Sequence, residues 1–353
     1  MSLAALLQTR IAASGPMTIA DYMAEALLNP DHGYYTTRTP FGAEGDFITA
    51  PEMTQMFGEL IGLCLAQSWM DQGAPAAFTL AELGPGRGTL MADALRATKQ
   101  VPGFGAAARI MLVEASPQLR QVQARMLDGY DVTWVDSAAD LPDAPLWCIA
   151  NEFFDALPIR QFVRDGAHWR ERCVGQQDGK LVIGLAPQGP QSALDHRRDD
   201  TQDGDLVETR PAATCIMVEL ARRIDAHGGV ALIVDYGDWR SLGDTLQAVR
   251  DHESTGILHA PGTADLTAHV DFEALARAAA PAAYTRLTPQ GVFLERLGIT
   301  HRAQALAETL YGNALNTHIA AHRRLTHPDE MGNLFKVLGV YPATAAPPPG
   351  LSA

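Results

Sequence analysis

A glycine-rich segment with an acidic residue before it is the strongest chemical signal in the sequence. The run Glu82-Leu-Gly-Pro-Gly-Arg-Gly follows a short apolar stretch and leads into a pattern typical of a helix. It carries glycines at three alternate positions: Gly84, Gly86 and Gly88. Glycine permits positive φ angles and lets the backbone approach a ligand closely. The segment therefore predicts a small-molecule binding loop between a strand and a helix.

The spacing of the loop argues against a phosphate ligand. The dinucleotide fingerprint is G-x-G-x-x-G and a P-loop ends in Lys followed by Ser or Thr, and the loop matches neither pattern. Glu82 would repel an anion but could hold an amino group. The loop therefore favours a ligand with a cationic head. A nicotinamide dinucleotide site, or a plain turn with surface acids, is the alternative.

Acidic residues also end the next two predicted strands. Glu114 has the position from which an acid holds ribose hydroxyls in nucleoside-binding α/β folds. Asp136 could accept a hydrogen bond from an adenine amino group. An amino acid head, a ribose and an adenine without phosphate together indicate S-adenosylmethionine. We predict that Pro85 and Ala115 line the same site.

A second group of polar residues follows the fourth predicted strand. Asn151, Glu152 and Asp155 would lie at the carboxyl edge of the sheet, where ligands bind in open α/β folds. Two carboxylates three residues apart can face the same way on a turn or on a first helical turn, and beside a sulfonium they suit a guanidinium acceptor. We predict Glu152 and Asp155 as catalytic residues and Asn151 as a cofactor contact. Capping of a helix in solvent is the alternative.

The long loop before residue 53 supplies the remaining candidates. Glu52 is predicted as a catalytic acid and Thr49 as a cofactor contact, in a loop that also contains Asp46 and could cover the cofactor. Alternatively, Thr49 or Glu52 simply starts the following helix, with Pro51 in its first turn. No metal is predicted, because the histidines and acids between residues 252 and 271 match no usual ligand spacing.

Alternating strands and helices must position these residues. The predicted parallel strands are Phe78–Leu83, Ile110–Glu114, Val132–Val135, Leu146–Ala150 and Val230–Asp235. Residues 159–210 carry antiparallel strand signals with Asp-Gly turns, which predicts a small β insertion. We expect an α/β fold in which residues 1–75 form a helical cap with the active-site loop. Residues 76–353 would form the catalytic domain, helical from about 300 to 342.

Composition limits the class of protein and of partner. The 353 residues are 47% hydrophobic and 19% charged, which suffices for a sizeable core. A formal charge of -14 disfavours nucleic acid and anionic membrane surfaces. No apolar run approaches the roughly 20 residues that cross a bilayer. Four scattered cysteines and the lack of a secretory or transit pattern predict a cytoplasmic protein with buried free thiols.

Several runs, in the same order along the chain, resemble the MidA family. They are Gly45–Glu52, Glu82–Leu90, Glu152–Pro158, Asp235–Gly237 and Pro261–Ala268, within matches from residue 17 to about 342. The resemblance implies a class I, Rossmann-like methyltransferase sheet with helical additions at both ends. It also implies S-adenosylmethionine as donor, with Glu82, the three loop glycines and Glu114 as cofactor positions.

The same resemblance implies an activity and a partner. The MidA family includes a mitochondrial assembly factor that methylates an arginine of a core NADH dehydrogenase subunit. We therefore expect a protein arginine methyltransferase with a protein substrate, such as a NADH dehydrogenase subunit. Two alternatives are an assembly factor that keeps the fold for stability and a methyltransferase of small molecules. The intact Glu82 and glycines disfavour the assembly factor, since a degenerate site would tolerate their loss.

Overall fold

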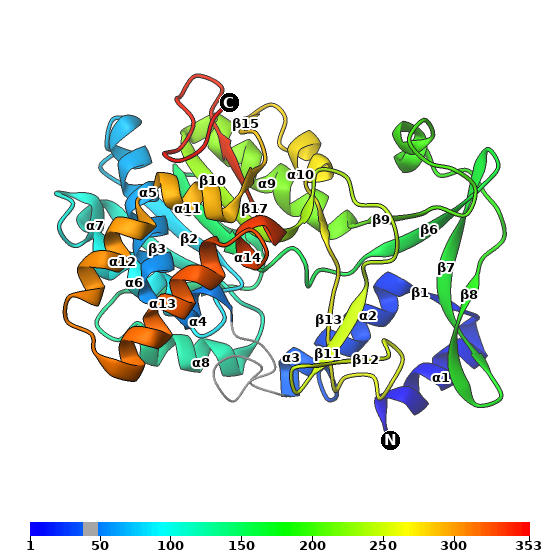
Figure 1. The fold of residues 1–353 in the computed structure, drawn as a ribbon. Helices are drawn as coiled ribbons and strands as arrows, with labels where there is room; N and C mark the ends of the chain where they lie inside the picture. The colour runs from blue at the N-terminus through cyan, green and yellow to red at the C-terminus, as the bar shows by residue number, and fades with distance from the viewer. Residues whose placement is uncertain (38–48) are drawn as a thin grey trace. The chain divides into compact units, whose positions relative to one another are not determined.

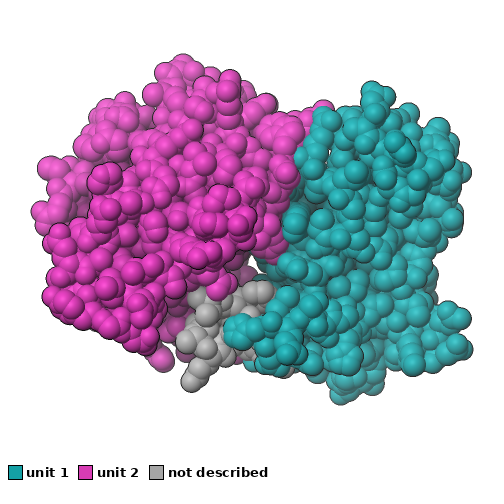
Figure 2. Space-filling view, in the orientation of Figure 1, with its two compact units in different colours: residues 1–40, 155–213, 240–271 teal, residues 41–154, 214–239, 272–353 magenta. Residues whose placement is uncertain are grey.

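The computed structural model describes residues 1–37 and 49–353, and the chain forms two compact units (Figure 2). Unit 1 comprises residues 1–40, 155–213 and 240–271, and unit 2 comprises residues 41–154, 214–239 and 272–353. Each unit is assembled from segments far apart in the sequence. The predicted division at residue 75 does not coincide with these units and stays a prediction about domains.

Unit 2 is built around a mixed sheet (Figure 1). Its main strands are β2 (Phe78–Leu83), β3 (Ala108–Val113), β4 (Val132–Val135), β5 (Leu146–Asn151), β10 (Gly229–Asp238), β15 (Ala283–Tyr284), β16 (Thr288–Pro289) and β17 (Phe335–Tyr341). The spatial order is β15-β17-β10-β5-β2-β3-β4. Strands from β10 to β4 are parallel, and β17 is antiparallel to β10. The chain order reverses beside β2, because β3 and β4 lie on one side of it and β5 and β10 on the other.

Helices surround this sheet (Figure 1). They are α4 (Ala50–Met53), α5 (Gln55–Asp71), α6 (Thr89–Thr98), α7 (Phe104–Ala107), α8 (Pro117–Met126), η1 (Ala138–Asp140), α9 (Pro211–His227), α10 (Phe272–Ala278), α11 (Gln290–Arg296), α12 (Ile299–Ala307), α13 (Gly312–Thr326) and α14 (Met331–Leu334). α5 packs against α6, α12 and β10, and its buried Phe57 and Trp69 join the hydrophobic core of the sheet. Ser116 caps α8, because its side chain accepts from the Leu119 amide at 3.4 Å.

The five predicted parallel strands are confirmed, with small shifts at their ends. The helical prediction up to about residue 342 is wrong at its end, because residues 335–341 form β17. Val337, Leu338 and Val340 in this strand are completely buried. A strand that is covered on both faces is apolar throughout, so its sequence has no alternation that separates it from a buried helix.

Unit 1 contains the predicted β insertion. Its elements are α1 (Leu3–Ser14), β1 (Met17–Thr18), α2 (Ile19–Leu28), α3 (Tyr34–Thr37), β6 (Arg160–Asp165), β7 (His168–Gln177), β8 (Lys180–Leu185), η2 (Ser192–Arg197), β9 (Leu206–Thr209), β11 (Gln247–Arg250), β12 (Glu253–Thr255), β13 (Asp265–Thr267) and β14 (Val270–Asp271). The order β1-β7-β6-β9, with β8 on β7, is antiparallel throughout, as predicted. A second sheet has the order β12-β11-β13.

The cysteines differ in exposure. Cys64 and Cys148 are buried, as predicted, whereas Cys173 is half-buried and Cys215 is exposed. The prediction failed for Cys215 because it lies on a solvent-facing position of α9, which apolar neighbours in the sequence do not reveal. Within the described ranges, no helix is both long and apolar enough to span a membrane.

A buried carboxylate links three helices of unit 2. Glu59 of α5 is 5% exposed. It accepts hydrogen bonds from Arg96 of α6 at 3.0 Å and from the Nε of Arg302 of α12 at 2.8 Å. These contacts hold α12 and α6 against the helix that covers the sheet.

We predict that Glu59→Gln lowers the free energy of unfolding by about 1–3 kcal/mol, because two guanidinium groups lose their charged acceptor. Urea unfolding of the purified protein measures the change. Glu308→Gln, at the exposed end of α12, is the matched control and should shift stability by less than about 0.5 kcal/mol. Equal unfolding midpoints for the two variants would contradict this role of Glu59.

Candidate active site

β2 brings Glu82 to the carboxyl edge of the sheet, at the point where the strand order reverses. Ligand crevices form at such points in open α/β sheets. The turn that follows places Gly84, Gly86 and Gly88 at φ angles of 62°, 53° and 85°. A Cβ atom on Gly84 would also lie 2.8 Å from a ring carbon of Phe153. Glycine is therefore required here both for the backbone conformation and for space.

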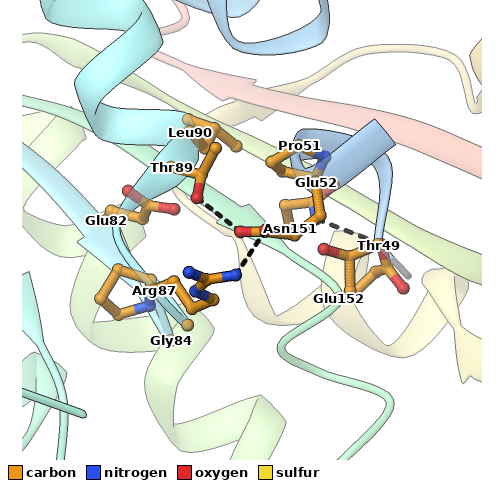
Figure 3. A pocket seen from close by; sticks show the side chains of 12 residues that line it. Thr49, Pro51, Glu52, Glu82, Gly84, Arg87, Thr89, Leu90, Asn151 and Glu152 are labelled. Carbon is orange, nitrogen blue, oxygen red and sulfur yellow. Dashed lines mark hydrogen bonds and ion pairs between the residues drawn. The ribbon is translucent and has the colours of Figure 1, made fainter. Parts of the chain in front are cut away.

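The glycine loop lines a pocket in unit 2 (Figure 3). Its lining residues are Thr49, Pro51, Glu52, Glu82, Gly84, Pro85, Gly86, Arg87, Thr89, Leu90, Asn151 and Glu152. The cavity is about 40 Å³, far below the roughly 300 Å³ or more of pockets that hold drug-sized ligands. Figure 3 shows the side chains of Glu52 and Arg87 between Glu82 and Glu152. A larger ligand enters this pocket only when these side chains move apart.

The Glu82 carboxylate is buried without a counter-charge. The residue is 3% exposed, and its Oε2 has no hydrogen-bond partner in the described part of the chain. Burial raises the pKa of this carboxyl to about 8, and the Met91 backbone amide offsets part of the rise. A cation beside the group would remove the cost of ionising it. The orphaned oxygen therefore fits the ammonium group of an amino acid head.

α4 forms another side of the pocket. Thr49 is its N-cap residue and Pro51 lies in its first turn, which confirms the predicted helix start. Glu52 accepts from the Thr89 hydroxyl at 2.5 Å, and its other oxygen lies 3.4 Å from Nη1 of Arg87. Both oxygens of this predicted catalytic acid thus contact the glycine loop and the start of α6. These contacts fasten α4 to the loop.

Glu152 follows β5 in a left-handed conformation, with φ at 49°. Such angles are uncommon outside glycine, and strained residues gather at functional sites. Its backbone amide donates to the Val234 carbonyl at 2.9 Å, and its Oε1 lies 3.4 Å from both the Ala50 amide and Nδ2 of Asn151. Asn151 is 8% exposed, and its Oδ1 has no hydrogen-bond partner among residues 1–37 and 49–353. The end of β5 therefore presents polar oxygen atoms to the pocket.

The predicted ribose contact lies next to this pocket in the sheet and is outside its lining. Glu114 follows β3, and its carboxylate accepts from the Ser116 amide at 2.8 Å and from Nε2 of Gln123 at 3.1 Å. Burial raises the pKa of this carboxyl, and these hydrogen bonds oppose the rise. Asp136 pairs with Arg120 at 2.5 Å and its side chain is 83% exposed.

Asp155 does not share a helical turn with Glu152. Of the two predicted settings, a turn or a first helical turn, the structure has bends and turns over residues 152–158, with Glu152 in a left-handed conformation. Asp155 is 5% exposed within unit 1, and its carbonyl accepts from the Ala268 amide at 3.1 Å. Burial, and then the charges of Asp265 and Asp155, raise the pKa of Tyr35. Asp155 is absent from the pocket lining, and so are Gly88 and Ala115.

The structure adds residues that the sequence did not single out. Arg87, Thr89 and Leu90 line the pocket, and the only available signal was their place between and after the loop glycines. Asp46 and most of the loop that was expected to cover the cofactor lie outside the described residues. In the described ranges, no group of three or more His, Cys, Asp or Glu residues is arranged to hold a metal ion.

Comparison with known proteins decides the family. The family model described as "Putative S-adenosyl-L-methionine-dependent methyltransferase" matches residues 60–290. This chain belongs to that methyltransferase family. Its glycine loop and β2 to β10 lie within the matched residues, and so does the pocket lining apart from Thr49, Pro51 and Glu52.

Curated relatives cover nearly the whole methyltransferase chain. The protein named protein arginine methyltransferase NDUFAF7, mitochondrial, from Danio rerio is 39% identical over 95% of this chain and 85% of its own length. The human protein of that name is 36% identical over 95% and 82%, and a Drosophila melanogaster homologue is 34% identical over 98% and 86%. These relatives are mitochondrial, which contradicts the predicted cytoplasmic location. Free thiols are expected in any reducing compartment, so the cysteines could not distinguish a cytoplasmic from a mitochondrial location.

Crystal structures resemble the methyltransferase as a whole. A Burkholderia thailandensis protein bound to S-adenosyl-homocysteine has a TM-score of 0.82 and 26% identity, covering 99% of this chain and 92% of that chain. A native structure of a Burkholderia thailandensis protein gives a TM-score of 0.80 at the same identity and coverage. The family and the bound ligand confirm the predicted methyltransferase fold and S-adenosylmethionine as the cofactor. The individual residues that bind it stay predictions.

We predict that Gly84→Ala weakens the binding of S-adenosyl-homocysteine by roughly tenfold or more, because the left-handed backbone alone costs about 1–2 kcal/mol for alanine. The new methyl group would also collide with the Phe153 ring. Isothermal titration calorimetry measures the affinity. Gly105→Ala in α7, where nothing lies within 4 Å of the new Cβ, is the matched control. Equal affinities of the two variants would show that ligand binding does not depend on glycine at position 84.

We also predict that the affinity for S-adenosyl-homocysteine rises with pH between 6 and 8. The free protein holds Glu82 protonated below its pKa of about 8, and only the ionised carboxylate attracts the ligand ammonium. One proton is thus released on binding, and the affinity rises roughly tenfold per pH unit below pH 8. Calorimetry across this range measures the slope.

Two variants separate Glu82 from other sources of that slope. Glu82→Gln should bind weakly with a flat pH profile, and Glu114→Gln should keep the slope of the unmodified protein. A flat profile for the unmodified protein, or an unchanged slope in Glu82→Gln, would rule out Glu82 as the group that titrates.

Proposed function

We propose that this methyltransferase transfers the methyl group of S-adenosylmethionine to an arginine side chain of a protein. The relatives named protein arginine methyltransferases support the acceptor, since they match over almost all of this chain. The observation that carries the proposal is the Glu152 carboxylate, which lines the pocket opposite Glu82 (Figure 3). A carboxylate suits a guanidinium, which stays protonated in water and donates several hydrogen bonds.

The proposed work of the pocket is mainly to orient the reactants. S-adenosylmethionine supplies an already activated methyl group on its sulfonium. Glu82 would accept the ammonium group, Glu114 would accept from the ribose hydroxyls, and the glycine loop would leave space for the ligand. Holding two reactants in the correct geometry contributes about 7–11 kcal/mol in well-oriented model systems. Thr49, Pro85, Ala115, Asp136 and Asn151 stay predicted cofactor contacts.

Glu152 is the proposed acceptor-binding residue. Its Oε1 lies 3.4 Å from two donors, the Ala50 amide and Nδ2 of Asn151. An ionised carboxylate would orient one guanidinium nitrogen toward the methyl group and accept the proton that this nitrogen loses. Glu52 and Asp155 stay predicted catalytic residues. We propose that Glu52 acts by fastening α4 to the glycine loop, because Thr89 and Arg87 engage its oxygens.

A respiratory NADH dehydrogenase subunit is the proposed acceptor protein. This part of the proposal rests on the resemblance to the MidA family and on the relatives' mitochondrial names. The net charge of -14 adds that the acceptor surface should be basic, since opposite charges speed association. Nucleic acid is not expected as a partner for the same reason.

We predict that the purified protein, incubated with donor labelled in the methyl group and a mitochondrial lysate, places the label on arginine of a protein. Acid hydrolysis of the labelled band followed by chromatography identifies the modified residue. Label on lysine, on a carboxyl group or on a small molecule would contradict the proposed acceptor. Donor binding without any label would favour the assembly factor.

We further predict that Glu152→Gln lowers kcat by roughly 100-fold or more, because it removes the proposed proton acceptor. The affinity for S-adenosyl-homocysteine should change by no more than about threefold, which is below 1 kcal/mol. Glu308→Gln serves again as the control for charge. Methylation by Glu152→Gln at the rate of the control would refute the role of Glu152.

A further inference from the structure

One buried side chain connects the elements on which the cofactor prediction depends. Gln123 lies in the middle of α8 and is completely buried. Its Nε2 donates to the Gly86 carbonyl at 2.8 Å and to Oε2 of Glu114 at 3.1 Å. Its Oε1 accepts from Nε1 of Trp134 at 2.8 Å. Both N–H groups and the carbonyl oxygen of this amide are therefore satisfied, as a buried amide requires.

The three contacts fix the direction of the amide. The Trp134 ring nitrogen can only donate, so the amide oxygen must face it. The NH₂ group is thereby directed at the glycine loop and at Glu114. Trp134 belongs to β4, Glu114 follows β3 and Gly86 follows β2, so Gln123 links the ends of neighbouring strands.

The same contacts hold the Glu114 carboxylate in one orientation. Its Oε1 accepts from the Ser116 amide and its Oε2 from Gln123. Neither of these two donors carries a charge, and the charge of Arg120, which donates to the Glu114 backbone carbonyl, also lowers the pKa of the carboxyl. Cβ and Cγ of Gln123 also lie 3.7 and 3.6 Å from where a Cβ on Gly88 would be, which places α8 directly against the loop.

We propose that Gln123 is a positioning residue for the cofactor: it orients the Glu114 carboxylate toward the ribose hydroxyls and fixes the Gly86 carbonyl. Gln123 itself is buried beneath these groups and does not contact the ligand. This inference rests on the proposed role of Glu114 in ribose binding. A leucine at this position would fill the space but leave Oε2 of Glu114 without this donor, and a glutamate would repel the carboxylate.

The test compares two ligands on the full-length protein. S-adenosyl-homocysteine and its 2′-deoxy analogue differ only in a hydroxyl that the oriented carboxylate would bind. We expect Gln123→Leu to weaken S-adenosyl-homocysteine by roughly tenfold and the 2′-deoxy analogue by less than about threefold in calorimetry. Gln121→Leu, on an exposed position of the same helix, is the matched control and should change neither.

A second comparison separates Gln123 from Glu114. Glu114→Gln should show the same selective loss, and adding Gln123→Leu to it should weaken binding little further, because the two residues act through one contact. Equal loss of both ligands in Gln123→Leu would show a merely structural role and overturn the inference. If Glu114→Gln still showed the selective loss in that case, the inference about Gln123 would fail while the ribose contact of Glu114 would stand. A Glu114→Gln variant that does not distinguish the ligands would refute the ribose contact and the inference together.

Trp134→Phe keeps the inference testable if Gln123→Leu does not fold. This variant removes the bond that orients the amide and keeps an aromatic ring at the position. We expect a smaller loss of affinity than in Gln123→Leu. S-adenosyl-homocysteine should again lose more affinity than the 2′-deoxy analogue, each compared with the unmodified protein. An unchanged ratio of the two affinities in Trp134→Phe would overturn the orienting role.

Discussion

A buried carboxylate without a counter-charge is the constraint around which this pocket is organised. Glu82 lies at the end of a central strand, where water cannot stabilise its charge. Its pKa is therefore raised to about 8, so the folded protein binds a proton there that the unfolded chain would release above pH 4.5. The stability of the free protein falls through this group as the pH rises from about 4.5 to 8. A bound cation would stabilise the ionised carboxylate and so remove this cost. Ligand binding and the stability of the fold are therefore linked through Glu82.

The order of the strands determines where the Glu82 carboxylate lies. Because the chain reverses beside β2, the ends of β2 and β5 meet at one edge without a helix between them. Glu82 and the left-handed glycines come from β2, and Asn151 and Glu152 come from β5. β3 and β4 carry Glu114 and Trp134 on the other side, and Gln123 connects them to the loop. The predicted cofactor residues thus come from separate strands, and hydrogen bonds through Gln123 join Glu114 to the glycine loop.

Local patterns in the sequence were sufficient for part of the site. Glu82, the glycines, Asn151 and Glu152 each sit next to a strand that its composition predicts, so their place at the sheet edge follows from the order of elements. The start of α4 at Thr49 follows in the same way from Pro51. The family model and the crystal structures confirm the fold and the cofactor, and the residues that bind the cofactor stay predictions.

Contacts between distant residues could not be predicted in this way. Glu52 looks like a free acid in the sequence, yet Thr89 and Arg87 engage it, and their side chains come from another element. Gln123 has no motif, since its role depends on three partners from three segments. β17 was predicted as helix because a fully covered strand has no alternation. The composition of this chain contains no signal from which the mitochondrial location of its relatives could have been predicted.

A crystal structure of this protein with S-adenosyl-homocysteine tests the central claim most directly. The account predicts the ligand ammonium within about 2.7–3.2 Å of the Glu82 carboxylate. It also predicts the ribose hydroxyls on Glu114, with Glu52 and Arg87 moved apart from their present positions. A ligand bound elsewhere, or one whose ammonium group contacts neither oxygen of Glu82, would contradict the account.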